Sequence, residues 1–386
     1  MMYNKRLLFG SACAGMLFFG ISLITLGSVV PGLKEKFQLD EISSGTLFSI
    51  LPFGILMGSL LFGPFCDKYG YKLLLALACV SMFAGFEGIA YAPSRSLLQV
   101  CIFLFGFGGG IINGATNALV ADISENRKGA NLSLLGVFYG IGALGMPFII
   151  GVLENSFNYS IIVSIVGFVT LVVGIFYLLI KFPVPKQTDN IKVMPGISLL
   201  KDGALILIAF FLFCQSSFEA IINNWITTYL STQMSVKANN ALYALSLFVA
   251  GMTVMRLLLG SIFRNTSAVK IWIGSFLLAF FGLLFLTAGH SFAAAVVGLI
   301  LLGAGFAAGF PIMLGFVGNR YKEFSGTAFS LVLVIALCGN MIVNYCMGII
   351  VQVYGIGQLL TVAFAELAVM TVLCISILKK INTNNY

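Results

Sequence analysis

The sequence predicts an all-α integral membrane protein whose twelve transmembrane helices form two pseudo-symmetric six-helix bundles. Two observations carry this prediction. The chain is 60% hydrophobic and only 9% charged, whereas soluble domains carry about 25% charged residues, so lipid must solvate much of its surface. The second half also repeats the first at an offset of 197 residues, with small residues at matching positions. The matched pairs are Gly63 with Gly260, Gly106 with Gly303, Gly108 with Gly305, Gly129 with Gly326, Ser133 with Ser330, Gly142 with Gly339, and Gly151 with Gly348.

Twelve apolar runs are each long enough to cross a bilayer as a helix, which takes about 20 residues. In chain order they cover residues 7–31, 45–65, 73–92, 97–122, 132–153, 159–181, 204–231, 240–262, 270–289, 291–318, 327–353 and 357–378. The strands of a membrane barrel need only about 9–11 alternating residues, so the length of these runs indicates helices. The first run lacks a small-residue cleavage site, which favours a retained helix over a signal peptide.

One long polar interruption divides the runs into two groups of six. It extends from Lys181 to Lys201 and contains three prolines and four lysines. The expected organisation is therefore an N-terminal bundle over residues 1–181, a cytoplasmic linker over residues 182–200 and a C-terminal bundle over residues 201–386. The other connections are short, so successive helices are expected to be antiparallel neighbours.

The net charge of +8 reflects membrane topology, and no nucleic-acid partner is expected. Sixteen basic residues fall in connections on the side of the N-terminus, and only four fall on the opposite side. The positive-inside rule places the side richer in Lys and Arg in the cytoplasm. We therefore expect a multi-pass protein of the cytoplasmic (inner) membrane with both termini in the cytoplasm.

Motifs for catalysis or nucleotide binding are absent from the sequence. It contains no P-loop, which argues against an ATP-driven pump. The eight cysteines lie within or at the ends of apolar runs without a CxxC pair, so we interpret them as packing residues and expect neither disulfides nor a metal site. A single histidine provides no catalytic or metal-binding set. We expect no enzyme activity and no cofactor.

The connection between the runs 45–65 and 73–92 carries a distinctive motif. Its residues, within the sequence GPFCDKYGYK, are Gly63, Asp67, Lys68, Gly70 and Lys72. The motif resembles the signature loop of the major facilitator superfamily, in which a Gly precedes an Asp, a basic residue, a Gly and a second basic residue. Gly63 allows close approach of two helices, Gly70 permits a tight turn, and Asp67 can accept hydrogen bonds from a helix N-terminus or pair with a cation. The resemblance implies that these residues form a conformational gate. Asp122 with Arg127 is similar to the cytoplasmic gate contacts of the family and is added to it.

A narrower resemblance links five runs to the fucose permease and glucose/galactose transporter branch of that superfamily, among them 97–122, 204–231 and 291–318. In the run 97–122, a glycine-rich stretch at 106–110 precedes polar residues and an Asn. The run 204–231 contains a Glu, Trp and Tyr series, and the run 291–318 contains Gly-Phe-Pro at 309–311. The resemblance implies that the first, fourth, seventh and tenth helices surround a central cavity.

Polar side chains at bilayer depth mark the candidate substrate-binding positions. The candidates are Asn113, Thr116 and Asn117 on one helix and Gln215, Glu219, Asn223 and Trp225 on another. Asn113, Thr116 and Asn117 share one helix face, as do Gln215, Glu219 and Asn223, because their spacings are three or four residues. Such faces suit a solute that carries hydroxyl groups. Polar side chains also join transmembrane helices to one another, and this alternative stays open.

Glu219 is the candidate coupling group. A charged side chain at bilayer depth costs roughly 2.5–3.5 kcal/mol by insertion scales and therefore needs a reason. A carboxyl group near mid-membrane on a cavity-forming helix suits proton uptake. Arg256 is expected to act with it, by pairing with Glu219 or with a substrate oxygen. Snorkelling of Arg256 to the interface, or a structural gate contact, is the alternative. Glu87 and Glu366 have no assigned role.

These features together indicate a secondary active transporter that moves a small polar solute by alternating access. A sugar is the favoured solute, and a proton or another cation is the expected coupling partner. Besides the lipid bilayer no further partner is expected, and the chain is expected to be a monomer. The first alternative is efflux of an amphipathic drug or metabolite by the same fold, which the 36 Phe residues keep open. An alternative of another class is a transport-inactive membrane sensor or scaffold.

Overall fold

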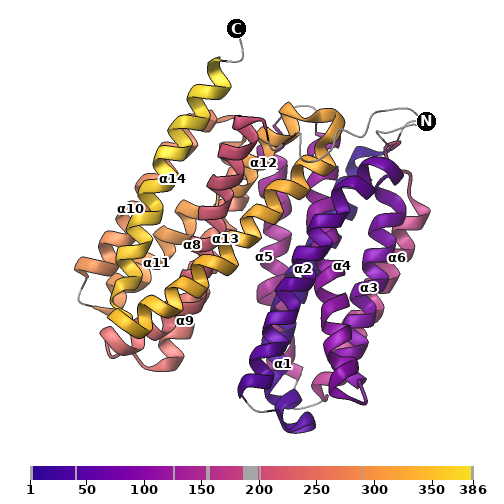
Figure 1. The fold of residues 1–386 in the computed structure, drawn as a ribbon, viewed down its shortest axis with the longest axis horizontal. Helices are drawn as coiled ribbons and strands as arrows, with labels where there is room; N and C mark the ends of the chain where they lie inside the picture. The colour runs from indigo at the N-terminus through magenta and orange to yellow at the C-terminus, as the bar shows by residue number, and fades with distance from the viewer. Residues whose placement is uncertain are drawn as a thin grey trace. The chain divides into compact units, whose positions relative to one another are not determined.

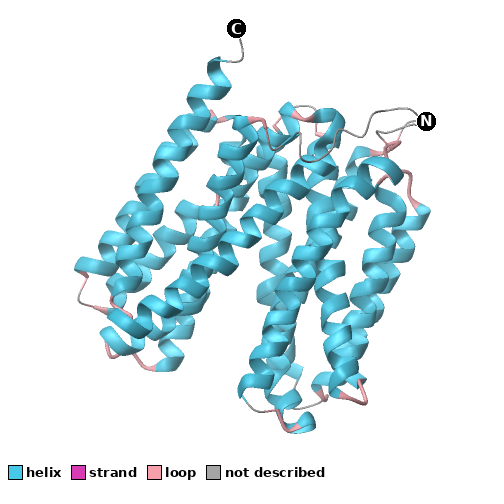
Figure 2. Cartoon of the chain, in the orientation of Figure 1, coloured by secondary structure: helices cyan, strands magenta, loops and turns pink. Residues whose placement is uncertain are grey.

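The structure is a computed structural model that describes residues 3–39, 41–124, 127–153, 157–185, 199, 201–289 and 291–383. Figures 1 and 2 show helices joined by short connections, and no strand occurs among the described residues. The helices are α1 (Lys5–Phe37), α2 (Glu41–Tyr69), α3 (Tyr71–Tyr91), α4 (Arg95–Ile123), α5 (Lys128–Leu153), α6 (Tyr159–Leu179), α8 (Gly203–Gln233), α9 (Ala238–Gly260), η1 (Ile262–Asn265), α10 (Ala268–Ala288), α11 (Phe292–Phe306), α12 (Gly309–Arg320), η2 (Lys322–Phe324), α13 (Ser325–Tyr354) and α14 (Gln358–Thr383).

The described residues contain twelve candidate membrane spans, which confirms the predicted fold class. Each predicted run overlaps a helix along nearly its whole length, except that the run 291–318 is interrupted. There α11 ends at Phe306 and α12 begins at Gly309, with a turn at Ala307 and Ala308. Pro311 explains the interruption, because it has no N–H group to donate to the carbonyl four residues earlier.

The chain divides into two compact units. Unit 1 contains residues 1–125, 138–193 and 321–330, and unit 2 contains residues 126–137, 194–320 and 331–386. The first turns of α5 therefore belong to unit 2, whereas η2 and the first turns of α13 belong to unit 1. The predicted boundaries of the bundles stay a prediction, and residues 186–198 of the predicted linker lie outside the described residues.

The two units share one pattern of helix packing. In unit 1, α4 packs against α1, α2 and α3, while α6 packs against α1 and α3. In unit 2, α11 packs against α9 and α10, α12 packs against α8, and α14 packs against α8 and α10. The pair α11 and α12 thus takes the place of α4, and α14 takes the place of α6. This correspondence agrees with the predicted pseudo-symmetry.

Glycines at matched positions allow the closest helix crossings in each unit. A Cβ on Gly106 of α4 would overlap the carbonyl oxygen of Leu51 on α2. A Cβ on Gly303 of α11 would likewise overlap the carbonyl oxygen of Phe248 on α9. Phe248 follows Leu51 at the same offset at which Gly303 follows Gly106. The repeat in the sequence therefore marks positions where two helix backbones touch.

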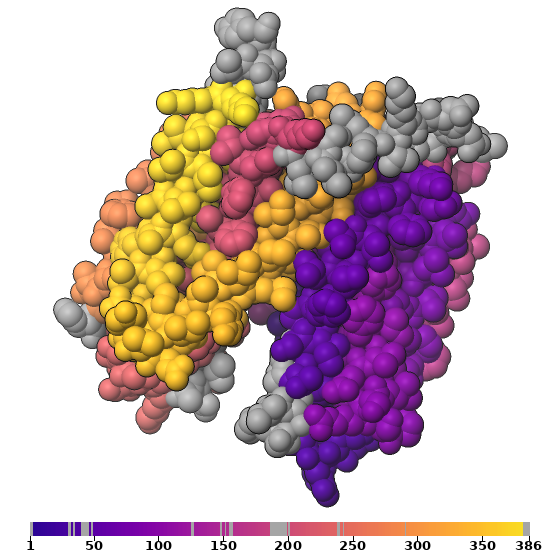
Figure 3. Space-filling view, viewed as in Figure 1, coloured from indigo at the N-terminus to yellow at the C-terminus, as the bar shows by residue number. Residues whose placement is uncertain are grey.

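Large apolar side chains are exposed on the outer helices. On α6, Ile165 and Val172 are 58% and 63% exposed, and on α14 Val372 is 64% exposed. Figure 3 shows α14 (yellow) at the surface of unit 2. Extended apolar surface of this kind is typical of proteins that meet lipid, because water would solvate it poorly.

Candidate functional site

The first candidate site centres on Asp67, near the C-terminal end of α2 in unit 1. Its side chain is buried, at 1% exposure. The carboxylate accepts hydrogen bonds from the backbone N–H of Gly326 at 3.2 Å, from the backbone N–H of Thr327 at 2.9 Å and from the Thr327 hydroxyl at 2.7 Å. These donors lie in the first turn of α13, where backbone N–H groups have no acceptor within the helix. Asp67 therefore caps α13, and its charge complements the positive end of the helix dipole.

Close packing of α2 against the first turns of α13 positions this carboxylate. A Cβ on Gly63 would lie 2.6 Å from both the carbonyl oxygen of Gly326 and the Cβ of Ser330. The Ser330 hydroxyl donates a hydrogen bond to the carbonyl oxygen of Ser59, one turn before Gly63. Gly63 therefore permits a close approach, as the sequence indicated.

The other residues of the signature motif lie at the end of α2 and the start of α3. Gly70 separates the two helices with a φ of +79°, a backbone conformation that glycine adopts without a steric cost. Lys68 and Lys72 are exposed. The motif thus combines one buried carboxylate with two exposed cations, and its role as a gate stays a prediction.

Asp122, at the C-terminal end of α4, binds the same part of α13. It accepts a hydrogen bond from the Tyr71 hydroxyl at 2.5 Å and from the Ser325 hydroxyl at 2.9 Å. Asp67 and Asp122 therefore bind successive residues of one helix terminus within unit 1. Arg127, which the sequence suggested as a partner of Asp122, is exposed and belongs to unit 2. That partnership remains a prediction.

Unit 2 repeats one element of this arrangement. The Ser133 hydroxyl of α5 donates a hydrogen bond to the carbonyl oxygen of Arg256 at 2.8 Å. Ser133 precedes Ser330 by 197 residues, and Arg256 follows Ser59 by the same offset. In each unit, a serine hydroxyl in the first turns of a long helix (α5 or α13) therefore donates a hydrogen bond to a backbone carbonyl of another helix.

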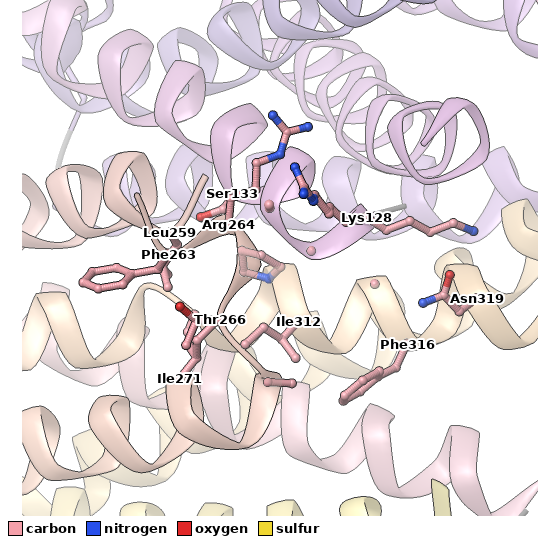
Figure 4. A pocket seen from close by; sticks show the side chains of 17 residues that line it. Lys128, Ser133, Leu259, Phe263, Arg264, Thr266, Ile271, Ile312, Phe316 and Asn319 are labelled. Carbon is pink, nitrogen blue, oxygen red and sulfur yellow. The ribbon is translucent and has the colours of Figure 1, made fainter. Parts of the chain in front are cut away.

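The charge at the matching position differs between the two units. Arg264 of η1 follows Asp67 by 197 residues, and its guanidinium donates to the Asn131 side chain at 3.4 Å. Figure 4 shows Arg264 and Lys128 at a pocket of about 200 Å³ within unit 2. Lys128 is buried and donates to the carbonyl oxygen of Gly318 at 2.7 Å. The two repeats thus share the hydrogen bond from serine to a backbone carbonyl. They differ in charge at the matching position, which is Asp67 in one repeat and Arg264 in the other.

The second candidate site lies on α8 in unit 2, beside the interruption between α11 and α12. The amide nitrogen of Gln215 donates to Glu219 Oε1 at 2.6 Å and to the carbonyl oxygen of Phe306 at 3.0 Å. Phe306 ends α11, and the last carbonyls of a helix have no donor within it. Gly309 leaves room for Gln215, since a Cβ there would overlap the amide oxygen. The helix interruption therefore supplies the acceptor that orients Gln215 toward Glu219.

Arg256 of α9 contributes a positive charge to this site. Its side chain is buried, at 8% exposure, and its charge acts on the Glu219 carboxylate. Gly136 of α5 packs against it, since a Cβ on Gly136 would lie 3.0 Å from the Arg256 Cδ atom. Burial and this packing favour an interaction with Glu219 over snorkelling to the interface.

The remaining predicted residues of α8 have two different environments. Trp225 donates its indole N–H to the Asn344 side chain of α13 at 2.9 Å. Asn223 is exposed at the helix surface, one turn beyond Glu219. The structure therefore joins Gln215 to Glu219 and fixes Trp225 on α13, while it leaves Asn223 at the surface.

The predicted polar face of α4 is largely engaged within unit 1. The Asn117 amide donates to the backbone and side-chain oxygens of Asn113 at 2.8 and 3.1 Å. Thr116 is fully buried, and its hydroxyl donates to the carbonyl oxygen of Ile112 at 2.7 Å, close to the sulfur of Met16 on α1. Thr116 thus packs against α1, and Asn113 is the more exposed of the three.

The two carboxylates without an assigned role each bind a serine of a neighbouring helix. Glu87 of α3 accepts a hydrogen bond from Ser164 of α6 at 2.7 Å. Glu366 of α14 accepts one from Ser217 of α8 at 2.5 Å. Such bonds join transmembrane helices in pairs.

Comparison of this chain with known proteins identifies its family. The family model described as the Major Facilitator Superfamily matches residues 8–342. The chain belongs to the Major Facilitator Superfamily. It is 23% identical over 342 residues to an uncharacterized transporter, y4wD, of Sinorhizobium fredii, a match that covers 88% of this chain and 90% of the relative. It is 24% identical over 360 residues to the glucose/mannose transporter GlcP of Bacillus subtilis, covering 88% of this chain and 87% of that one.

Solved structures of the superfamily share the fold. The Escherichia coli fucose:proton symporter FucP matches with a TM-score of 0.78 at 17% identity, covering 95% of this chain and 98% of that one. The human organic anion transporter MFSD10 matches with a TM-score of 0.79 at 15% identity, covering 96% and 100%. The resemblance read from the signature loop is confirmed, and the chain is a multi-pass membrane protein of a transporter family.

Several residues of both sites were missed by the sequence reasoning. They are Tyr71, Ser325, Thr327 and Phe306. The repeat in the sequence indicated that the start of α13 makes a close contact. The matched pairs Gly129 with Gly326 and Ser133 with Ser330 lie in the first turns of α5 and α13. A position where both halves keep a small residue at a helix start indicates a close contact there.

Proposed function

We propose that this superfamily member is a proton-coupled transporter that takes up a small polar solute of the sugar class by alternating access. The observation that carries the proposal is the 2.6 Å hydrogen bond between Gln215 and Glu219 on a membrane-spanning helix. An ionisable residue inside the membrane is costly and by default marks a substrate or ion pathway. Two relatives support the solute class, since GlcP is named a glucose/mannose transporter and FucP a fucose:proton symporter.

Glu219 is the proposed proton carrier. Proton binding would neutralise its carboxylate and weaken its attraction to Arg256, whose charge acts on it. Proton binding would also weaken the hydrogen bond from Gln215 to Glu219, because a protonated carboxyl group is a weaker acceptor than a carboxylate. Proton binding and the arrangement of the solute-binding amides would thereby be linked through one hydrogen bond.

The solute is proposed to bind polar side chains of α8 in unit 2, and Asn113 of α4 in unit 1 stays a further candidate. Gln215, Asn223 and Asn113 offer amide donors and acceptors for hydroxyl groups. Trp225 offers an apolar ring face, held in place by its bond to Asn344. Sugars present hydroxyl edges and apolar C–H faces, so this combination suits them.

The signature motif is proposed to control the rate of conformational change without contacting the solute. Asp67 and Asp122 bind the first turn of α13 through hydrogen bonds that cost free energy to break, and Gly63 permits the close approach of α2 to that turn. The exposed cations Lys68 and Lys72, together with Arg127, would complete the gate. With both termini in the cytoplasm, as the distribution of basic residues predicts, this motif would lie on the cytoplasmic side of the inner membrane.

An aromatic carboxylate is a second candidate solute class. The chain is 27% identical over 158 residues, 40% of its length, to the 4-hydroxybenzoate transporter PcaK of Pseudomonas putida. The buried cation Arg256 would be a suitable partner for such an anion. This candidate differs from the first in charge, so the two are separable by experiment.

Uptake by the purified protein in liposomes tests both candidates. The solutes are labelled monosaccharides and labelled 4-hydroxybenzoate, assayed with an imposed proton gradient and again after a protonophore. We expect at least one monosaccharide to accumulate above equilibrium and the protonophore to abolish its accumulation. Accumulation of 4-hydroxybenzoate alone would replace the sugar proposal with the second candidate. A solute that moves without response to the gradient would contradict proton coupling.

A further inference from the structure

A long apolar groove separates α10 from α14 on the outer surface of unit 2. Its volume is about 610 Å³, and none of the candidate site residues lines it. The lining side chains on α10 include Val269, Trp272 and Phe280, and those on α14 include Phe364 and Leu378. Figure 1 shows the two helices as neighbours along their length. The groove opens on a surface where many apolar side chains are exposed, so in a membrane it would face lipid.

The length of the groove matches one leaflet of a bilayer. The rings of Phe280 and Phe364 lie 6.1 Å apart, so the later part of α10 meets the beginning of α14. The helices are therefore antiparallel, and Val269 and Leu378 lie at the same end of the groove. Residues 364–378 of α14 span about 21 Å and residues 269–280 of α10 about 16 Å at 1.5 Å per residue. The hydrocarbon of one leaflet is about 15 Å thick.

Positive charge gathers at the end marked by Val269 and Leu378. Lys270 and Lys379 directly follow these residues in the sequence, and both are exposed. The charged residues of α10 and α14 are Lys270, Glu366, Lys379 and Lys380. Glu366 binds Ser217 of α8, so its carboxylate is engaged on that helix. The charged residues that α10 and α14 contribute at this end of the groove are therefore all basic.

A buried donor lies close to the same end. Trp272 lines the groove two residues after Lys270, at 4% exposure, and its indole N–H has no hydrogen-bond acceptor among the described residues. A buried N–H without an acceptor is costly and calls for a partner that the structure does not contain. The ester carbonyls of a phospholipid lie just below its phosphate and would provide such an acceptor.

We propose that this groove binds one anionic phospholipid. One acyl chain lies along the groove, an ester carbonyl accepts the Trp272 N–H, and the negative headgroup lies beside Lys270 and Lys379. A headgroup with a net negative charge is favoured over a zwitterionic one, because basic residues at the membrane surface attract anionic lipid selectively. The site is independent of solute binding on α8.

The test measures lipid binding by the full-length protein, delipidated in a nonionic detergent. Phosphatidylglycerol and phosphatidylcholine with identical acyl chains are added in turn, and bound lipid is counted by native mass spectrometry. We expect one phosphatidylglycerol per protein, bound about thirtyfold more tightly than phosphatidylcholine. Equal affinity for the two lipids would overturn the proposal. So would a stable dimer that excludes both lipids, because a second copy would then cover the groove.

Three variants locate the site. The double variant Lys270→Gln, Lys379→Gln should lose the preference for phosphatidylglycerol, and Trp272→Phe, which keeps an aromatic ring but no N–H, should bind it several-fold more weakly. Ala368→Phe, which fills the groove from an exposed position, should lose both lipids. The matched control is Lys237→Gln, Lys322→Gln, which removes two exposed charges outside the groove and should bind as the wild type does. Thermal unfolding without lipid verifies that each variant is folded. Wild-type selectivity in the folded Lys270→Gln, Lys379→Gln protein would refute the proposed site.

Discussion

Thr327 donates two hydrogen bonds to Asp67, one from its backbone N–H at 2.9 Å and one from its hydroxyl at 2.7 Å. The two residues are 260 positions apart in the sequence. Because Asp67 is buried, these bonds form away from water, and a hydrogen bond to a charged group contributes about 1.5–3 kcal/mol. Asp67 of the signature motif therefore binds one helix terminus strongly, as its proposed effect on the rate of conformational change requires.

Asp67→Asn tests this contact. The substitution removes the charge and replaces one acceptor oxygen with an NH2 group, which donates hydrogen bonds and cannot accept them. We expect turnover to fall about tenfold or more, which corresponds to roughly 1.4 kcal/mol, while the Kd for the solute stays unchanged. Initial transport rates and equilibrium binding are measured in parallel. Lys237→Gln, at an exposed position outside the motif, is the control and should transport normally. A Kd weakened as much as the rate would show instead that the loop affects the solute site.

Gly303→Ala tests the glycine crossings that carry the repeat. The added Cβ would overlap the carbonyl oxygen of Phe248, so α9 and α11 would have to separate. We expect a loss of about 1–3 kcal/mol of stability, measured as a lower Tm in detergent. Gly274→Ala in α10 is the matched control, because nothing lies within 4 Å of its added Cβ. Equal Tm values for the two variants would show that α9 and α11 do not cross as closely at Gly303 as the structure shows.

The twelve membrane spans found among the described residues, and their repeat, were predictable from the sequence for a physical reason. Bilayer thickness sets the length of each apolar run, and a glycine is needed wherever two helix backbones touch, as at Gly106 and Gly303. The donor to Asp67 was not predictable. Its chemistry indicated a helix N-terminus, but a chain with many helices offers many such termini, and only the fold selects Thr327.

The α8 site was predictable in its residues but not in its geometry. The spacing of Gln215 and Glu219 placed them on one face, and a hydrogen bond joins them. Their third partner, the carbonyl oxygen of Phe306, exists because α11 ends there. The apolar run 291–318 predicts one continuous helix, in which that carbonyl would already have a donor. Pro311 was the local signal for the interruption.

Gln215→Ala tests whether this amide organises the site. The variant leaves the carbonyl oxygen of Phe306 without a donor and removes the donor to Glu219. We expect a loss of about 1–3 kcal/mol of stability and a lower rate of solute uptake. The Tm and the uptake rate are compared with those of Gln352→Ala, an exposed glutamine on α13. Unchanged uptake in a folded Gln215→Ala protein would exclude this amide from the transport site.

Trp225 and Asn344 are expected to act as a pair. Trp225→Phe removes the indole N–H, and Asn344→Leu removes its acceptor while it keeps a similar volume. If the hydrogen bond positions the ring, the two single variants and the double variant should weaken solute binding by similar amounts. The double-mutant cycle should then give a coupling free energy of about 1 kcal/mol. Additive losses in Kd would mean that the residues contribute independently.

Glu219→Gln tests proton coupling most directly. Glutamine keeps the size of the side chain and a hydrogen-bonding group beside Gln215, but it cannot bind or release a proton. Wild-type and variant proteins in liposomes are compared in two assays, solute exchange at equilibrium and solute accumulation driven by an imposed proton gradient. We predict that the variant still exchanges solute and no longer accumulates it. Accumulation at the wild-type level would exclude Glu219 as the proton carrier and leave it a structural or solely solute-binding residue.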